Sequence, residues 1–252
     1  MTTYASSPAE NLLAYLPDSV KGFKVARASN TTLTVTAGVC RDSTGIFDMS
    51  LASTTTINTA VVGKNGIDTG TFAASTVYAV HVVNDSTGHI LPGCIISTSA
   101  SAPVLPTGYD IFRRIGWAVT DSSTHFLVLV QTGEGMVRRY EFDTMQQILN
   151  GGAQIVSTAI DLSAYVPALQ DMPIGLSCSI TPNTAGNYVK VRQVGSSSTS
   201  TPLISGDVKS VATLTPASVL VGLSTGTPEI EYHVSEATDT ASIYLQYFVD
   251  YL

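Results

Sequence analysis

The chain has 252 residues, with 12 Lys and Arg against 19 Asp and Glu, and carries a formal charge of −7 at pH 7. Hydrophobic residues make up 44% of the chain and charged residues only 12%, so it can build a large core and is not disordered over most of its length. The acidic balance excludes a nucleic-acid partner, because phosphate binding needs clustered Lys and Arg. No stretch approaches the roughly 18 to 20 apolar residues of a membrane-spanning helix, so no membrane insertion is expected. The first residues also lack the pattern of a secretory signal.

Ser, Thr, Val and Ile are abundant, whereas Lys and Glu are scarce. This composition is typical of β-sheets. Strand edges with so few charges favour association between copies, and an oligomer is therefore predicted. The three cysteines, Cys40, Cys94 and Cys178, are odd in number and widely spaced. They are interpreted as small buried hydrophobic residues and not as a disulfide framework or a metal site.

Residues 7–16 carry the pattern of a short helix. Ser7 is a suitable N-cap, Pro8 occupies the first helical position, Glu10 completes a capping box, and Pro17 follows three leucines. A helix of about two turns is not stable alone in water. It is expected to dock, either on its own domain or in a partner.

From Gly22 onward the hydrophobic pattern alternates with a period of two, which predicts strands separated by polar turns. In the first half the predicted strands are Thr32 to Thr36, Thr55 to Val62, Val77 to Val83, His89 to Ser97, Ile115 to Val119 and Phe126 to Val130. Strands at this spacing favour a sandwich or a barrel.

The pattern changes near Glu141. Asp143 can cap a short helix from Thr144 to Asn150, which Gly151 and Gly152 would end. A domain boundary is predicted here. Residues 1–141 hold 9 basic and 10 acidic residues, whereas residues 142–252 hold 3 and 9. Most of the negative charge therefore belongs to the C-terminal part.

Strands are predicted again in the second half, at Gly175 to Ile180, Tyr188 to Val194, Val208 to Leu214, Ser218 to Leu223, Glu229 to Val234 and Ser242 to Leu252. In the last of these, one face carries Ile243, Leu245 and Tyr247, and the other carries Tyr244 and Phe248. Such a strand is expected to be buried on both faces, between two layers or at a subunit contact.

The predicted fold class is all-β, with two β-sandwich or jelly-roll-like domains, a short N-terminal helix and a short inter-domain helix. The predicted organisation is an N-terminal anchoring segment at 1–21, a β domain at 22–141, a helical linker at 142–156 and a C-terminal β-sandwich at 157–252.

Motifs for catalysis are weak. The sequence from Gly222 to Gly226 matches the G-x-S-x-G pattern around Ser224, but a nucleophile elbow needs a following helix, and here a strand is predicted. A hairpin turn is the preferred interpretation. The four histidines lack metal-ligand spacing. No catalytic, cofactor-binding or metal residue is predicted, and the protein is not expected to be an enzyme. A pair of glycosidase carboxylates from separate strands stays open.

Two arginine pairs and one aromatic group have alternative interpretations. Neighbouring residues on a strand face opposite ways, so Arg113-Arg114 and Arg138-Arg139 are expected to brace a domain contact and not to form anion sites. Trp117, near Tyr109 and Phe112, is either a core residue or part of a sugar-stacking platform. The core is favoured for a single Trp in a β domain.

Several short motifs in order carry a family resemblance. They are Leu33-Thr34-Val35-Thr36-Ala37-Gly38, Gly63-Lys64-Asn65-Gly66-Ile67-Asp68-Thr69-Gly70, Thr76-Val77-Tyr78-Ala79-Val80, Leu105-Pro106-Thr107-Gly108-Tyr109 and Arg113-Arg114-Ile115-Gly116. This series resembles domains of tailed-bacteriophage virion proteins, among them tail fibres, head fibres and capsid decoration proteins. The resemblance covers about residues 22–141. The C-terminal half resembles the jelly-roll or β-sandwich tips of phage fibres only in its general pattern of strands and loops, without matching motifs.

The resemblance implies a non-enzymatic, trimeric structural protein that is assembled in the bacterial cytoplasm and built into a virion. Its N-terminal segment would contact other virion proteins, and its distal domain would be displayed toward the host surface. Two alternatives stay open. One is a cement protein that stabilises the capsid. The other is a receptor protein that binds or cleaves host glycans through loops such as Thr181 to Asn187 or Gly195 to Pro202.

Overall fold

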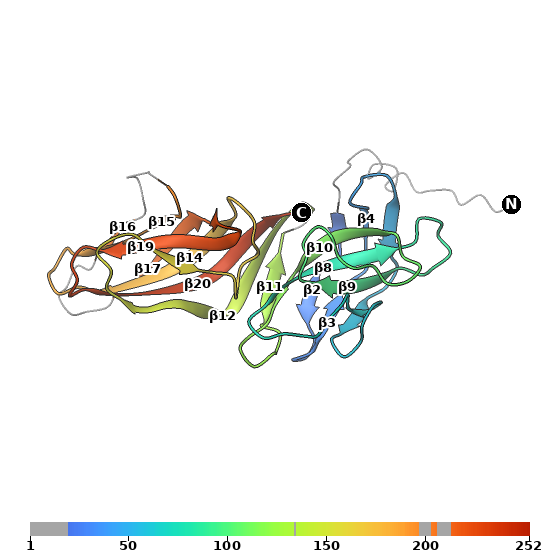
Figure 1. The fold of residues 1–252 in the computed structure, drawn as a ribbon, viewed down its shortest axis with the longest axis horizontal. Coiled ribbons are helices and arrows are strands. Elements are labelled where there is room, and N and C mark those ends of the chain that lie inside the picture. The colour runs from blue at the N-terminus through green and yellow to red at the C-terminus, as the bar shows by residue number, and fades with distance from the viewer. Residues whose placement is uncertain (1–19, 134, 197–202, 206–212) are drawn as a thin grey trace. The chain divides into compact units, whose positions relative to one another are not determined.

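The computed structural model describes residues 20–133, 135–196, 203–205 and 213–252. Within these residues every regular element is a β-strand, twenty in all, and the all-β expectation is confirmed (Figure 1). The described part of the chain contains no helix able to cross a membrane. The predicted N-terminal helix at 7–16 lies outside the described residues.

The chain divides into two compact units. Of the described residues, those within 20–127, 131–138 and 251–252 form unit 1, and those within 128–130 and 139–250 form unit 2. The predicted boundaries of the four segments stay a prediction. Neither unit is a single stretch of sequence, because strands near residue 130 and at the C-terminus contribute to both.

Unit 1 contains three small sheets. Their strand orders are β1 (Val20–Gly22), β4 (Gly38–Arg41), β5 (Asp48–Leu51); β2 (Val25–Arg27), β3 (Thr32–Val35), β6 (Thr55–Asn58); and β10 (Ile111–Val119), β8 (Val77–Asn84), β9 (Gly93–Ser97), β7 (Gly66–Ile67). One hydrophobic cluster, which includes Cys40 of the first sheet, Ile57 of the second and Val80 of the third, joins all three. The sheets therefore share a core from which the connecting loops project.

A buried arginine ties this core to its edge strands. Arg138 is 1% exposed, and its Nη1 donates to the carbonyls of Phe23 (2.9 Å) and Ile115 (3.0 Å). Its Nη2 donates to the carbonyl of Gly22 at 2.7 Å. Arg139 turns the other way, with its guanidinium carbon 3.6 Å from the ring centroid of Tyr247. The expectation that the two arginines face opposite ways is confirmed.

Unit 2 is built from two sheets. Their orders are β11 (Leu129–Thr132), β12 (Val137–Gly152), β20 (Thr240–Tyr251), β14 (Pro173–Thr181), β17 (Thr213–Leu220); and β13 (Thr158–Asp161), β19 (Thr227–Val234), β15 (Tyr188–Gln193), β16 (Leu203–Ser205), with β18 (Gly222–Ser224) paired to β19. Leu176 and Cys178 of β14 and Val191 of β15 are fully buried. This arrangement is consistent with a β-sandwich (Figure 1).

The predicted helix from Thr144 to Asn150 is wrong, because these residues continue the strand β12. Instead of capping a helix, the amide of Asp143 donates to the carbonyl of Val128 at 3.1 Å. Further along, Nε2 of Gln147 donates to Oη of Tyr244 on β20 at 3.3 Å. Pairing with a neighbouring strand outweighs local capping signals, which are worth only about 1 kcal/mol.

The last strand, β20, was expected to be buried on both faces, between two layers or at a subunit contact. One face is buried and the other, with Tyr244 and Tyr247, is half-buried in the chain alone, so a subunit contact stays a prediction. Ile243 and Leu245 point inward, but the register shifts opposite Gly175 and Leu176, and beyond this bulge Phe248 points inward instead. Tyr247 therefore lies on the outer face with Gly175. A Cβ on Gly175 would overlap the ring of Tyr247, so the ring occupies the space that the glycine leaves. Simple alternation cannot reveal a bulge.

The preferred interpretation of Ser224 is confirmed. β18 ends at Ser224 and β19 begins at Thr227, with the two residues paired. Between them Thr225 and Gly226 have φ of 50° and 88°, as a type I′ hairpin turn requires. His233, further along β19, is paired with Lys190 of β15, and its Nδ1 lies 3.5 Å from Oγ of Ser157.

The buried cysteines and the core tryptophan are confirmed as well. Cys40, Cys94 and Cys178 are free and buried, and burial raises the pKa of each thiol to about 12. Trp117 is 4% exposed. Its expected neighbours do not form a platform with it, because Phe112 packs edge-on against His81 and Tyr109 bonds to a loop carbonyl.

Candidate interaction surface

The four-residue sequence Asp-Ser-Thr-Gly occurs twice in unit 1, each time directly after a strand. One copy begins at Asp42 after β4, and the other begins at Asp85 after β8. Short Asp side chains often accept hydrogen bonds from amides two or more residues further on and so shape a loop. The repeat therefore predicts two loops of similar structure.

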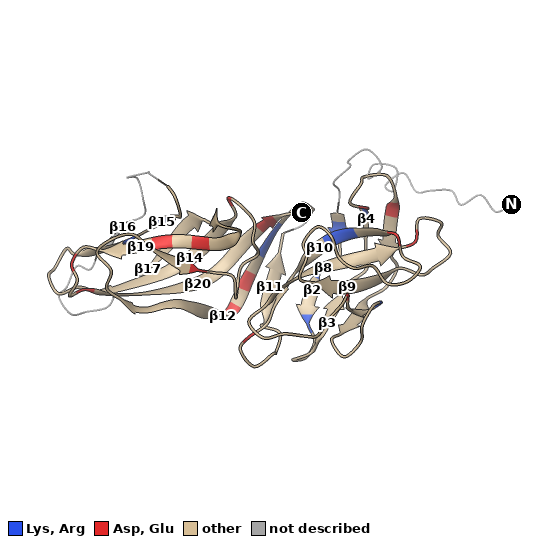
Figure 2. Cartoon of the chain, in the orientation of Figure 1, with Lys and Arg blue, Asp and Glu red and all other residues tan. Residues whose placement is uncertain are grey.

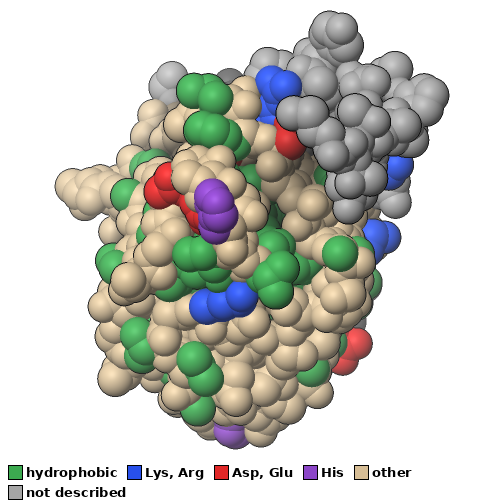
Figure 3. Space-filling view, turned by 90° about the vertical axis from the view of Figure 1, so that its right-hand side faces the viewer, with side chains coloured by type: hydrophobic (Ala, Val, Ile, Leu, Met, Phe, Trp, Pro, Cys, Tyr) green, Lys and Arg blue, Asp and Glu red, His purple; other side chains and the backbone are tan. Residues whose placement is uncertain are grey.

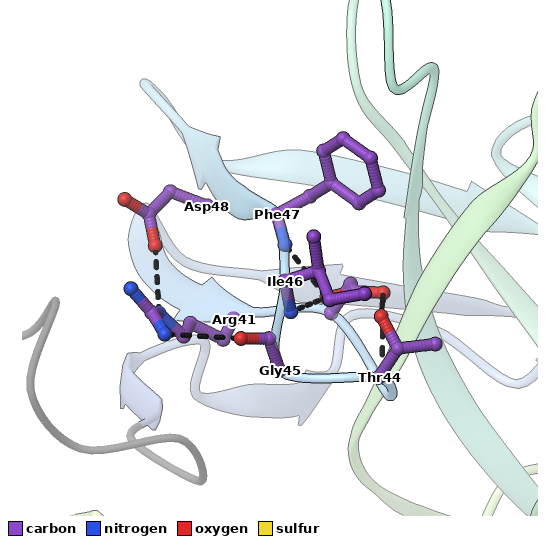
Figure 4. A network of polar contacts seen from close by, with 7 residues as sticks. Arg41, Thr44, Gly45, Ile46, Phe47 and Asp48 are labelled. Atoms are coloured by element: carbon purple, nitrogen blue, oxygen red, sulfur yellow. Dashed lines mark hydrogen bonds and ion pairs between the residues drawn. The ribbon is translucent and has the colours of Figure 1, made fainter.

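The first loop wraps around the carboxylate of Asp42. Oδ1 accepts hydrogen bonds from the amides of Ile46 (2.8 Å) and Phe47 (2.9 Å). Oδ2 accepts one from Oγ1 of Thr44 at 2.6 Å and one from its amide at 3.2 Å. Figure 4 shows the amides of Ile46 and Phe47 and the side chain of Thr44 turned toward this centre. Gly45 completes the turn with a φ of 71°.

The carboxylate of Asp42 stays ionised despite its burial. Asp42 is 1% exposed, and burial alone would raise its pKa, but the hydrogen bonds from Thr44, Phe47 and Ile46 outweigh this and lower the pKa. On the outside of the loop, Arg41 donates from Nη1 to the carbonyl of Gly45 at 3.0 Å and from Nε to Asp48 at 3.2 Å.

The second loop repeats this arrangement around Asp85. Its carboxylate accepts hydrogen bonds from the amides of Thr87 (2.9 Å), His89 (2.8 Å) and Ile90 (3.2 Å). Oγ1 of Thr87 donates as well, at 2.7 Å. The side-chain bond from Thr87, followed by these amides, lowers the pKa of Asp85 to about 2. Gly88, like Gly45, has a φ of 71°.

Each loop ends in two large apolar residues that reach solvent. Ile46 and Phe47 are 70% and 38% exposed, and Ile90 and Leu91 are 36% and 78% exposed. Asp42 accepts hydrogen bonds from the amides of Ile46 and Phe47, and Asp85 accepts one from the amide of Ile90. The backbone that carries these side chains is therefore fixed. The apolar groups are thus held at the surface in a preformed arrangement.

Two further loops hold the second apolar pair in place. The carbonyl of Leu91 accepts hydrogen bonds from Nζ of Lys64 (2.9 Å) and Oη of Tyr109 (2.8 Å). The same Nζ lies 5.9 Å from the ring centroid of Tyr109. A Cβ on Gly108 would lie 2.7 Å from Cδ1 of Ile90, so the loop before β10 packs closely on this side chain.

These loops together form what we call the loop-tip surface. It consists of the exposed aliphatic residues Val61, Val62, Ile90, Leu91 and Val104, which are 42%, 66%, 36%, 78% and 55% exposed. Figure 3 shows hydrophobic side chains on either side of a basic one at this end of unit 1. Figure 2 shows how few charged positions the strands themselves carry. The loops therefore hold these aliphatic groups in solvent as a candidate interaction surface.

The described residues contain no group of three or more His, Cys, Asp and Glu side chains placed to hold a metal ion. The loop from Thr181 to Asn187, expected as a possible glycan contact, is fixed by the buried Asp239. That carboxylate accepts hydrogen bonds from the amide of Asn183 (2.8 Å) and Nδ2 of Asn187 (3.0 Å). The loop from Gly195 to Pro202 lies largely outside the described residues.

The loop-tip surface was not predicted from the sequence, which offered the loops Thr181 to Asn187 and Gly195 to Pro202 as possible contacts and left the binding residues unknown. A signal was present, because an aliphatic pair follows Asp-Ser-Thr-Gly after one intervening residue, at Ile90 and Leu91. A polar turn is expected to be followed by a strand, and here the apolar residues belong to the loop instead. The described residues thus form an all-β fold that carries this candidate surface.

No protein-family model matches the chain, and no curated protein sequence does. Solved structures with some similarity include the infectious bursal disease virus VP2 subviral particle, with 13% identity and a TM-score of 0.27, over 94% of this chain and 59% of that one. The T13 particle of the same virus has 12% identity and a TM-score of 0.24, over 92% and 67%. The Cry4Aa toxin of Bacillus thuringiensis has 7% identity and a TM-score of 0.24, over 93% and 52%.

The chain spans 59% of the length of the VP2 chain that it matches. At TM-scores this low, the similarity carries no argument about function.

Proposed function

We propose that the protein is a structural component of a bacteriophage virion, a trimeric fibre-type protein displayed on the particle that takes part in attachment to the host surface. The ordered motifs within residues 22–141 support this role through their resemblance to phage virion proteins. The observation that carries the proposal furthest is the loop-tip surface, where rigid loops hold aliphatic side chains such as Leu91 in solvent. Such a surface suits permanent contact between proteins.

In this role the protein acts by binding and not by catalysis. Three copies joined together would present three identical weak sites, and their avidity exceeds the affinity of one site by orders of magnitude. The C-terminal unit, for which we propose a jelly-roll-like connection of its strands, would be the displayed part. Its fixed loop from Thr181 to Asn187 is one candidate contact for a host glycan.

Two measurements test this proposal. An antibody raised against unit 2 should label purified phage particles in electron micrographs. Light scattering should give three times the chain mass of 26.4 kDa. A chain that stays monomeric and is absent from particles would contradict the proposal. New reducing ends, released from host polysaccharide by the purified protein, would point to a glycan-cleaving enzyme instead.

A capsid cement protein is the second candidate, and the apolar character of the loop-tip surface favours it. A cement protein needs a firm, dry contact with the shell, which aliphatic side chains such as Val62 and Leu91 supply. In that case labelled protein should bind purified capsids in a fixed ratio and raise their melting temperature. A tail fibre would do neither.

A further inference from the structure

The loop-tip surface has a definite chemical character that limits what can cover it. Its exposed side chains are aliphatic, and the basic group beside them is Lys64. The carboxylates of Asp85 and Asp68 also lie close by, but they are bound to the amides of Ile90 and Val104. The carbonyl of Leu91 (2.9 Å) and the nearby ring of Tyr109 hold Nζ of this lysine in place. A complementary partner is therefore an apolar segment with a carboxylate near its apolar residues.

Residues 1–19, which lie outside the described residues and directly precede β1, have this composition. They contain Leu12, Leu13 and Leu16, together with Glu10 and Asp18, and no Lys or Arg. The other undescribed stretches differ, because 197–202 consists of Ser, Thr and Pro, and 206–212 contains a lysine. Nineteen residues can extend roughly 60 Å, which is long enough to reach another molecule.

We propose that the loop-tip surface is the docking site for residues 7–16 of a neighbouring copy of the chain. The leucines of that segment would cover Val62 and Leu91, and Glu10 would approach Lys64. The inference rests on the proposed function, because a role in a particle requires the copies to be joined. If each copy donates its segment and accepts another, two copies can exchange segments across a twofold axis, or three or more copies can pass them around a closed ring.

Leu91 is a suitable position for a test because its side chain does not support the fold. It is 78% exposed, and Lys64 and Tyr109 bind its backbone carbonyl, which any residue supplies. Val156 in unit 2 is a matched control, since it is also aliphatic and 65% exposed. The three native cysteines are buried, so introduced cysteines should react alone.

The decisive experiment uses two full-length chains, one with Leu13→Cys and one with Leu91→Cys and a size tag, expressed in the same cells. A disulfide between these two chains can form only between molecules. After mild oxidation we expect about tenfold more of the mixed dimer than from Leu13→Cys with tagged Val156→Cys, because docking raises the effective concentration of the two thiols. Equal yields from both pairs would overturn the inference.

A chain that carries both Leu13→Cys and Leu91→Cys completes the test. If it forms the disulfide only within one molecule, the segment docks on its own copy and the inference is wrong. Antibody labelling of particles, done in parallel, separates the two proposals. Labelled particles without the mixed dimer would refute the docking site but leave the virion role intact. The mixed dimer without labelled particles would support the docking site and contradict the virion role.

Discussion

The two Asp-Ser-Thr-Gly loops have the same local sequence and the same pattern of hydrogen bonds, but their surroundings differ. Asp42 is 1% exposed and Asp85 is 8% exposed. The first loop is joined to β10 by the amide of Ser43, which donates to the carbonyl of Phe112 at 2.7 Å. The second is joined to Asp110, which accepts the amide of Ser86 at 2.7 Å. The tetrapeptide thus specifies the loop, and its neighbours decide how firmly the loop is held.

The largest effect is expected from Asp42→Ala. This change removes four hydrogen bonds and leaves the amides of Ile46 and Phe47 without their acceptor at a partly buried position, which should lower the free energy of unfolding by about 2 to 4 kcal/mol. Chemical denaturation measures it. Asp42→Asn keeps one acceptor oxygen and should cost less. A loss no larger than that of Asp85→Ala would contradict the proposed difference between the loops.

His81 and Asp85 in unit 1 should lower the free energy of unfolding in two different pH ranges as the solution is acidified. Burial lowers the pKa of His81 to about 4. Because the unfolded histidine binds a proton near pH 6.5, stability should fall by roughly 3 kcal/mol as the pH drops from 6.5 to 4. The pKa of Asp85 is lowered to about 2, so its contribution is present above pH 4 and is lost only between pH 4 and 2. Unfolding measured at a series of pH values should show both losses of stability. In the control variant His81→Gln the loss between pH 6.5 and 4 should be absent, and the loss between pH 4 and 2 should stay.

Gly88→Ala should have a moderate effect that shows the backbone requirement alone. Gly88 has a φ of 71°, and a Cβ there would meet nothing within 4 Å. The expected cost is therefore only the strain of a left-handed alanine, about 1 kcal/mol. Thermal unfolding measures it. If Gly88→Asn costs as much as Gly88→Ala, the conformation is not the reason, because Asn tolerates this region.

The smallest effect on stability is expected from Leu91→Ser. The side chain is 78% exposed, and surface substitutions of this kind usually change the free energy of unfolding by less than about 0.5 kcal/mol. Association between copies should weaken instead, which sedimentation measures. A clear loss of stability with unchanged association would show that Leu91 supports its loop and not a contact.

The sequence pattern predicted the elements whose side chains alternate without interruption. The residues of β19 follow this rule, whereas β8 was predicted as a short, mostly apolar run and is buried on both faces except at its two ends. The pattern failed at β12, where the helix signals around Asp143 are local and the pairing with β20 is not. It also placed Phe248 on the wrong face of β20, because a bulge turns the following side chains to the other face without any change in composition.

The candidate surface depends on contacts between chain segments that are distant in sequence. The turn at Asp85 was expected from its residues, but the positions of Lys64 and Tyr109 beside Leu91 come from chain segments 27 and 18 residues away. A hydrogen bond to a backbone carbonyl leaves no mark on the residue type that accepts it. This is why Leu91 was assigned to a strand.

The burial of all three thiols makes the chain convenient to modify. With the pKa of each raised to about 12, hardly any thiolate exists near neutral pH, and alkylating dyes or crosslinkers find no competing target. A single cysteine placed at any exposed position can therefore carry a fluorophore, a gold cluster or a glycan ligand in defined stoichiometry, without first removing the native ones from the core.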